Sequence, residues 1–265
     1  MDVLMSKHAG ATQWFRALTP KPQSRSRLFC FPYAGGGAAI FQDWAQALPP
    51  DMEVCAAMLL GRSSRMREPP LTRRSTVVEH LVQAFTFYFD KPFAIFGHSV
   101  GALIGFDLAR RLRREAGVEP NHMFVSGCHA PHLPDADPPP YNLPDDEFIE
   151  YLRRLNGTPR AMLEHQELMA LMMPLLRADL EAVSTYTYVD SPPVSCPGSA
   201  YGGLRDSAVS REQLAAWREQ TTANFILRMF NGNHFFHPPG GTTVDKHAQL
   251  RTLSTRRRVH VRGAL

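Results

Sequence analysis

The stretch FAIFGHSVG, residues 93–101, decides the fold of this chain. A strand-like apolar run is followed by the pattern Gly-x-Ser-x-Gly and then by the helical pattern of residues 102–112. A sharp turn between a strand and a helix strains the backbone of Ser99 and pushes its side chain out over the sheet. Gly97 and Gly101 suit this turn because a Cβ atom there would strike the neighbouring elements. The motif predicts a nucleophilic serine at a helix N-terminus, where N–H groups stabilise an anion; the alternative is a tight turn with an idle serine.

The length and composition are those of an α/β protein outside the membrane. The 265 residues fit one large domain or two small ones. Apolar residues make up 44% of the chain, and no apolar run approaches the ~20 residues of a membrane span. Residues 1–19 have no signal-peptide pattern, so we expect a cytoplasmic protein without membrane association.

The net charge of +4 belongs to the C-terminal tail rather than to a binding face. Residues 251–265 carry five arginines and no acidic residue, and subtracting these from the 29 basic residues leaves 24 against 25 acidic ones. We therefore expect no nucleic-acid partner.

The cysteines lack metal-ligand spacing and are expected to be buried, reduced thiols: Cys30, Cys55, Cys128 and Cys196.

Strand and helix patterns alternate along most of the chain. Expected strands cover residues 27–31, 53–59, 93–96, 122–126, 196–201 and 224–230. Expected helices cover residues 38–48, 75–89, 102–112 and 210–220. This alternation predicts an α/β fold with a mostly parallel central sheet and helices on both faces.

The chain divides into a core, an insertion and two ends. We expect an irregular N-terminal segment over 1–26, a core formed by 27–130 and 194–254, and a basic tail over 255–265. Residues 131–193, proline-rich at first and then helical, are expected to form an inserted helical lid.

The lid contains a helical pattern rich in methionine and leucine over residues 168–180. Methionine is flexible and suits a surface that accepts varied acyl chains, so Met172 and Met173 are candidate substrate contacts. The alternative is that these side chains only pack the lid.

A serine hydroxyl needs a base, and the base needs an orienting acid. In an elbow fold the acid follows the serine and the histidine follows the acid along the chain. Asp206 comes after the expected strand 196–201, and His234 comes after the expected strand 224–230. Because both turns lie at the carboxyl ends of parallel strands, Asp206 is predicted to orient His234, which acts as base and then acid.

Three alternatives stay open for these residues. Asp206 could cap the helix that follows it, and His237 is a rival for His234. His98, inside the elbow, could also take part in catalysis, but it is expected to pack or to form a hydrogen bond locally.

An oxyanion hole requires two N–H donors, and one is predicted at Val100, directly after the nucleophile. The other is expected from the glycine-rich loop at residues 31–37, at Ala34. A phosphate-binding loop is the alternative, but the run lacks the Gly-Lys-Ser/Thr ending of a P-loop.

The chain resembles the type II thioesterases, stand-alone α/β-hydrolases that serve polyketide synthases and nonribosomal peptide synthetases. The motifs that carry this resemblance are Phe-Pro-Tyr-Ala-Gly-Gly at 31–36, Gly-Arg-x-x-Arg with Glu-Pro-Pro at 61–70, Gly-His-Ser-Val-Gly-Ala at 97–102, Arg-Ala-Asp at 177–179 and His-Phe-Phe at 234–236. The chain is also similar to the vertebrate oleoyl-carrier-protein hydrolases. The resemblance implies an editing thioesterase that removes acyl groups from the phosphopantetheine arms of acyl or peptidyl carrier proteins, with no cofactor and no metal.

The sequence departs from the family pattern in three places. Leu60 stands where proline is common, and Asn233 stands where a glycine often precedes the histidine. After Phe236, residues 237–241 interrupt the expected closing helix, and only 244–253 is a weak helical candidate.

Two other functions remain open. One is a carboxylester hydrolase acting on small free esters, and the other is a hydrolase-fold binding protein with a silent site. For an acidic carrier partner, the candidate docking residues are Arg62, Arg65, Arg67, Arg153, Arg154 and Arg160.

Overall fold

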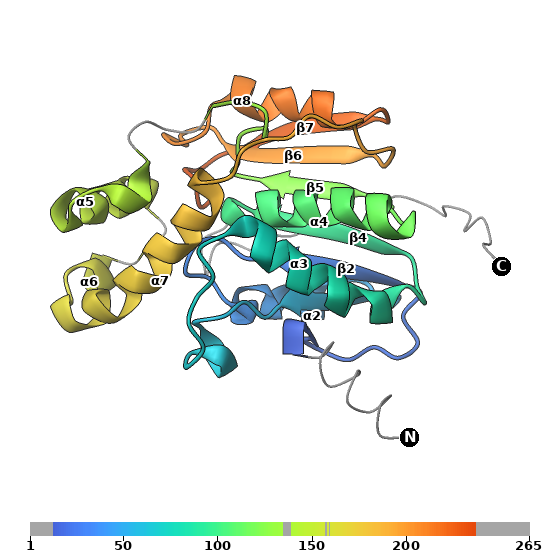
Figure 1. Cartoon of the computed structure of the whole chain (residues 1–265), viewed down its shortest axis with the longest axis horizontal. Coiled ribbons are helices and arrows are strands. Elements are labelled where there is room, and N and C mark those ends of the chain that lie inside the picture. Colours follow the sequence, from blue (N-terminus) through green and yellow to red (C-terminus); the bar gives the residue numbers. More distant parts are fainter. Residues whose placement is uncertain (1–12, 135–138, 157, 159, 237–265) are drawn as a thin grey trace.

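A seven-stranded sheet forms the centre of the computed structural model, which describes residues 13–134, 139–156, 158 and 160–236 (Figure 1). The strands are β1 (Phe15–Ala17), β2 (Ser26–Phe31), β3 (Met52–Ala57), β4 (Phe93–His98), β5 (Met123–Ser126), β6 (Gly198–Gly203) and β7 (Phe225–Phe230). Their order is β1-β3-β2-β4-β5-β6-β7, and every neighbouring pair is parallel except β1 with β3. The predicted mostly parallel sheet is therefore confirmed.

Strand β1 was not expected, because residues 1–26 were predicted to be irregular. Residues Phe15–Ala17 instead pair antiparallel with β3 at the edge of the sheet. Phe15 is fully buried, with ring centroids 4.9 Å from Phe29 and 5.6 Å from Phe85. Burial of this one aromatic side chain holds a strand that is too short to show an alternating pattern in the sequence.

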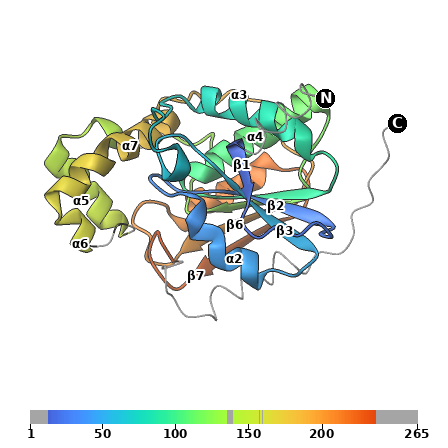
Figure 2. The same ribbon diagram turned by 90° about the horizontal axis from the view of Figure 1, so that it is seen from below.

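Apolar side chains fill both faces of the sheet, and successive residues of a strand serve opposite faces. In β2, Phe29 and Phe31 belong to one apolar cluster, whereas Leu28 and Cys30 belong to the other. Figure 2 shows α3 and α4 covering one face and α2 covering the opposite face. Because both faces are buried, the central strands are nearly continuous apolar runs.

The helices stand close to their expected places. They are α2 (Gln42–Ala47), α3 (Arg74–Phe85), α4 (Val100–Ala116), α5 (Asp145–Leu155), α6 (Arg160–Leu163), α7 (Gln166–Ser184) and α8 (Arg211–Ala215). Short 3₁₀ turns are η1 (Ala38–Phe41), η2 (Ser63–Arg65), η3 (Thr86–Tyr88), η4 (Pro140–Asn142) and η5 (Ala216–Gln220). The expected helices 38–48 and 210–220 each divide into an α-helical and a 3₁₀ part.

Helix α4 begins directly after the elbow and ends at Gly117, whose φ of 66° is the left-handed conformation that glycine adopts without strain. The N–H of Gly117 donates to the carbonyl of Arg113 and caps the helix. Ten of its residues are buried, so α4 is the central helix behind the elbow.

The segment 131–193, called the lid segment below, lies between β5 and β6 and contains α5, α6 and α7. Figure 1 shows these helices projecting beyond one end of the sheet. Helix α5 has three acidic residues in its first turn and ends at Asn156 in the left-handed conformation. Helix α7 extends beyond the expected 168–180 at both ends and contains Pro174. Within the described ranges, no helix is long and apolar enough to cross a membrane.

The four cysteines are buried and form no disulfide bonds, as expected from their apolar surroundings. Burial raises the pKa of Cys55 to about 12 and that of Cys196 to about 12. The thiols of Cys55 and Cys196 therefore stay protonated at neutral pH.

Candidate active site

Ser99 lies in a strained turn between β4 and α4, with φ 53° and ψ −122°. A Cβ atom on Gly97 would lie 2.2 Å from the carbonyl oxygen of Gly101, and one on Gly101 would lie 2.2 Å from the carbonyl oxygen of Phe31. Both flanking positions therefore require glycine for the steric reason that the motif predicted. The backbone N–H of Ser99 donates to the carbonyl of Ser126 at 2.7 Å, which fixes the turn to the neighbouring strand.

His234 and Asp206 form a buried pair at the ends of two neighbouring strands. His234 Nδ1 lies 2.9 Å from Asp206 Oδ2, and the two side chains are 4% and 0% exposed. The other carboxylate oxygen of Asp206 accepts hydrogen bonds from the N–H groups of Ala208 at 2.8 Å and Val209 at 3.2 Å. The carboxylate is thus held in one orientation, with one oxygen directed at the imidazole.

The two loops that carry this pair are in close contact. The N–H of Arg205 donates to the carbonyl of Gly232 at 2.7 Å, and a Cβ atom on Gly203 would lie 2.1 Å from the carbonyl oxygen of Asn233. Only glycine at 203 permits this approach. Asn233, a departure from the family pattern, accepts the N–H of Phe235 at 3.1 Å through its side chain and so closes its own turn.

The structure addresses two of the alternatives left open by the sequence. Helix α8 is capped by Ser210, whose side chain accepts the N–H of Gln213, so Asp206 is not its cap. His98 is buried, and its Nδ1 lies 2.9 Å from Ser126 Oγ, which is the local hydrogen bond that was expected. His237 lies outside the described residues, as do the helical candidate 244–253 and the tail 255–265.

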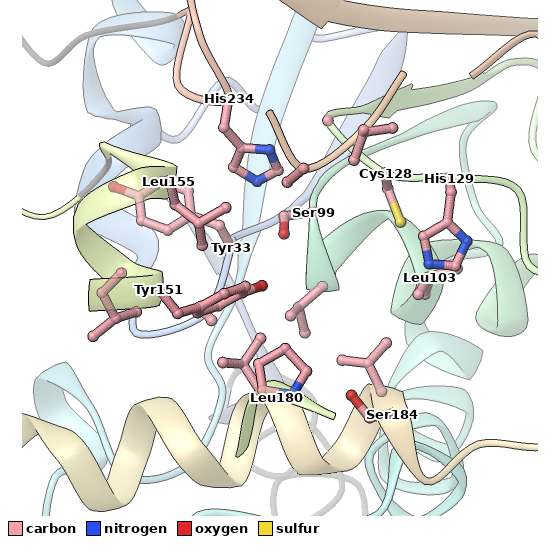
Figure 3. A pocket seen from close by; sticks show the side chains of 18 of the residues that line it. Tyr33, Ser99, Leu103, Cys128, His129, Tyr151, Leu155, Leu180, Ser184 and His234 are labelled. Atoms are coloured by element: carbon pink, nitrogen blue, oxygen red, sulfur yellow. The ribbon is translucent and has the colours of Figure 1, made fainter. Parts of the chain in front are cut away.

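A cavity of about 430 Å³ brings the predicted site residues together. Ser99, His234, Ala34 and Val100 all line it, and Figure 3 shows the Ser99 hydroxyl and the His234 imidazole beside the same space. The serine, the histidine and the two candidate oxyanion donors therefore share one chamber, with Asp206 directly behind the histidine. Among the described residues, no group of three or more His, Cys, Asp or Glu side chains could hold a metal ion.

The lid segment supplies much of the cavity wall. The apolar residues that it contributes are Leu152, Leu155, Leu176, Leu180 and Val183. Met172 and Met173, the predicted substrate contacts, are not part of the lining and instead pack, half-buried, against the core. They precede Leu176 by about one helical turn, and a Cβ atom on Gly35 would lie 3.8 Å from the methyl group of Met172. The predicted helix does line the cavity, but through residues nearer its C-terminus.

Tyr151 is a cavity residue that the sequence did not indicate. It lies on α5, and Figure 3 shows its hydroxyl reaching toward the middle of the cavity. Burial, with a smaller contribution from the negative charge of Asp206, raises the pKa of Tyr151 to about 12. The hydroxyl therefore stays protonated at neutral pH and can donate a hydrogen bond.

Two of the arginines suggested for carrier docking are buried and paired. Arg62 forms an ion pair with Asp179 at 2.6 Å, and Arg65 forms one with Glu68 at 2.7 Å. Both guanidinium groups are less than a tenth exposed, so they are corrected from docking residues to structural ones. Arg67, Arg153 and Arg154 are exposed, and the side chain of Arg160 lies outside the described part of the chain.

A serine elbow after β4, with the histidine–aspartate pair beyond β6 and β7, places the chain among the α/β-hydrolases. Residues 26–242 match the thioesterase domain family, and the chain belongs to that family. The resemblance read from the motifs is thereby confirmed, and the chain is an enzyme of the thioesterase class.

Several characterised proteins are similar over most of their length. Gramicidin S biosynthesis protein GrsT of Aneurinibacillus migulanus is 44% identical over 224 residues, which cover 84% of this chain and 88% of that protein. RedJ, the thioesterase of the prodiginine pathway in Streptomyces coelicolor, has a TM-score of 0.81 at 35% identity, covering 88% of this chain and 91% of RedJ. BorB, the type II thioesterase from the borrelidin biosynthetic cluster, has a TM-score of 0.81 at 32% identity, covering 91% and 96%.

Proposed function

We propose that this protein is an editing thioesterase, which hydrolyses acyl groups from the phosphopantetheine arms of carrier proteins in polyketide or nonribosomal peptide biosynthesis. The observation that carries the proposal is the buried His234–Asp206 pair, 2.9 Å apart, beside a cavity that also contains Ser99. The named relatives, which belong to gramicidin S, prodiginine and borrelidin biosynthesis, support this substrate class. We further propose that the enzyme works in the cytoplasm.

The chemistry follows from which nitrogen of His234 faces Asp206. Since Nδ1 donates to the carboxylate, Nε2 is left as the base that takes the proton of Ser99. The serine oxygen then attacks the thioester carbonyl, and the N–H groups of Val100 and Ala34 hold the resulting oxyanion. Collapse expels the pantetheine thiolate, which takes the proton from His234.

The second half of the reaction repeats these roles with water. His234 Nε2 removes a proton from the water, the hydroxide attacks the acyl-serine, and the oxyanion forms in the same place. When it collapses, the proton returns to Ser99 and the free carboxylic acid leaves. Asp206 stabilises the imidazolium in both halves and does not itself become protonated.

A panel of acyl-carrier proteins, matched acyl-pantetheine thioesters and free esters of the same acids tests this function. The expected order of kcat/KM places the acyl-carrier substrates first and the free esters last. A preference for free esters would instead identify a carboxylester hydrolase. Absence of turnover on every substrate, together with no labelling of Ser99 by a fluorophosphonate, would identify a binding protein.

Leu180 is expected to limit the length of the acyl chain. It lies on α7 and is 9% exposed, and Figure 3 shows it on the lid side of the cavity. Leu180→Trp should fill part of the cavity and shift the ratio of kcat/KM for short over long chains by about tenfold. The matched control is Leu171→Trp on the same helix, where the leucine is 67% exposed. An equal change in both variants would show that the cavity wall does not select chain length.

Three exposed arginines are expected to dock an acidic carrier: Arg67, between β3 and α3, and Arg153 and Arg154, on lid helix α5. Reversing the charge of Arg67, Arg153 and Arg154 together should lower kcat/KM for acyl-carrier substrates by about tenfold at low salt, and less as salt rises. Turnover of acyl-pantetheine thioesters should stay unchanged because they have no carrier surface. Arg25→Glu is the control: this exposed arginine precedes β2 and so lies at the opposite end of the sheet. Equal losses on both substrate types would refute the docking role.

A further inference from the structure

The glycine-rich loop after β2 is clamped by an ion pair from two distant parts of the chain. Arg62 follows β3, and Asp179 lies on lid helix α7, 117 residues away. The guanidinium contacts both carboxylate oxygens, Nη1 to Oδ2 at 2.8 Å and Nη2 to Oδ1 at 2.6 Å. The two side chains are 7% and 8% exposed, so the pair is shielded from solvent.

Each partner of the pair also binds the backbone of the loop. The N–H of Gly35 donates to Asp179 Oδ2 at 2.7 Å, and Arg62 Nη1 donates to the carbonyl of Gly36 at 3.0 Å. Arg62 is held in turn through Nε by the carbonyl of Leu60 at 3.1 Å. The pair therefore fixes one N–H and one C=O group on adjacent residues of the loop.

These contacts determine where the N–H of Ala34 points. Because a peptide unit is planar, fixing the Gly35 N–H orients the peptide that follows Ala34. The peptide that precedes Ala34 is fixed through the carbonyl of Tyr33, which accepts the N–H of Gly36 at 2.9 Å. The peptide after Ala34 is thus fixed by Asp179, and the peptide before it is fixed by Gly36, which Arg62 holds in place.

We propose that Asp179, together with Arg62, is a positioning residue that shapes the oxyanion hole from the lid. The inference rests on the proposed function in one respect, the assignment of the Ala34 N–H as an oxyanion donor. Asp179 does not touch the substrate; it acts through the Gly35 N–H and through Arg62. The lid helix that forms one wall of the acyl cavity thereby also sets the geometry of the hole.

The sequence of the loop explains why it needs such a clamp. Gly35 has a φ of 74°, a left-handed conformation that favours glycine. A Cβ atom there would also lie 2.7 Å from Leu176 Cδ2 and would displace that side chain. With Gly36 and Gly37 beside Gly35, the loop can adopt many backbone conformations when nothing restrains it. A buried ion pair contributes little net stability compared with apolar residues of similar size, but it does fix an orientation.

The test replaces both charges at once, because one buried charge left without its partner would destabilise the fold. The double variant Arg62→Met/Asp179→Leu keeps the volume and removes the clamp. The matched control is Arg74→Met/Asp107→Leu, which removes a second buried ion pair, 2.7 Å long and 2% and 11% exposed, between α3 and α4. Thermal unfolding and circular dichroism report the fold of both variants.

Two measurements separate positioning from general structural damage. The first is the rate at which a fluorophosphonate labels Ser99, since the phosphoryl oxygen enters the oxyanion hole during that reaction. The second is the affinity for a boronic acid, which forms a tetrahedral anion on Ser99, compared with the affinity for a non-hydrolysable acyl-pantetheine thioether. A structural role would weaken both ligands alike.

For the clamp variant we expect kcat to fall by about 10²–10³-fold with little change in KM, as for loss of one oxyanion donor. Labelling and boronate binding should weaken in parallel, while thioether binding stays unchanged; the control variant should match wild type in all of these measurements.

Unchanged labelling of a folded clamp variant would overturn the inference and leave the proposed function intact. Failure to label wild-type Ser99 would overturn the proposed function itself. If the double variant does not fold, Arg62→Lys, which keeps both charges but loses the fork, must show an intermediate loss of labelling, and wild-type labelling there would overturn the clamp.

Discussion

Ser99→Ala is expected to abolish turnover, with a loss in kcat on the order of 10⁶-fold, and to leave the fold intact. Ser99 is the residue that the elbow turn pushes over the sheet, and it lines the same cavity as His234. Without its oxygen no acyl-enzyme forms, and the remaining rate comes from the oxyanion hole and from binding alone. Steady-state hydrolysis of an acyl-carrier substrate measures the loss, and thermal unfolding checks the fold.

The nucleophile itself is identified by mass spectrometry after a slow substrate has been mixed with the wild-type enzyme. The acyl group should be found on the peptide that contains Ser99 and should be missing from the Ser99→Ala variant. The control is Ser64→Ala, an exposed serine between β3 and α3, which should keep wild-type turnover. An acyl group on any other residue would remove Ser99 from the mechanism.

The elbow could be located from the sequence because its requirements are local. The glycine at 97 is required by the adjoining turn and helix, since a Cβ atom there would strike the backbone of Gly101 and Ala102. The glycine at 101 is required by the neighbouring strand β2, whose Phe31 carbonyl oxygen a Cβ atom would strike, and the five-residue motif includes both positions. Asp206 and His234 could be located because parallel strands end at one edge of a sheet, so a residue's place after a strand gives its approximate place in space. The alternating pattern did not give the order of the strands; the structure places β6 beside β7, and this brings Asp206 Oδ2 within 2.9 Å of His234 Nδ1.

Features that depend on distant contacts could not be predicted in this way. Strand β1 forms because Phe15 finds an aromatic pocket made by other elements, and its own three residues show no period. Helix α7 was expected, but which of its turns faces the cavity depends on how the helix packs against the loop at Gly35. Met172 lies on a helix that does line the cavity, but it packs against the core about one turn before the lining residue Leu176.

The burial of the charged residues Arg62 and Asp179 is a second feature that the sequence did not predict. Each reads in isolation as a surface residue, since charged side chains are mostly exposed. They are buried because each has its partner 117 residues away in the chain and because Asp179 also accepts the backbone N–H of Gly35. The motifs Gly-Arg at 61–62 and Arg-Ala-Asp at 177–179 were visible, but the contact between them was not.

Asp206→Asn is expected to lower kcat by about 10⁴-fold although it changes a single atom. The carboxylate oxygen that accepts the N–H groups of Ala208 and Val209 can be kept as the amide oxygen, so the turn should persist. The amide nitrogen then faces His234 Nδ1 and donates to it, which places the imidazole proton on Nε2. An imidazole in that tautomer donates to Ser99 and no longer accepts its proton.

His234→Ala should cost on the order of 10⁶-fold in kcat, and the double variant Asp206→Asn/His234→Ala should be no slower than His234→Ala alone. Asp206 acts only through the imidazole, so its substitution has nothing left to disturb once the imidazole is gone. Single-turnover hydrolysis of one acyl-carrier substrate by all three variants provides the comparison, with His237→Ala as a control that should retain most activity. If the two losses multiplied, Asp206 and His234 would act independently, and the 2.9 Å contact between them would not be part of the mechanism. If His237→Ala were the more damaging change, the base would have to be reassigned to that histidine.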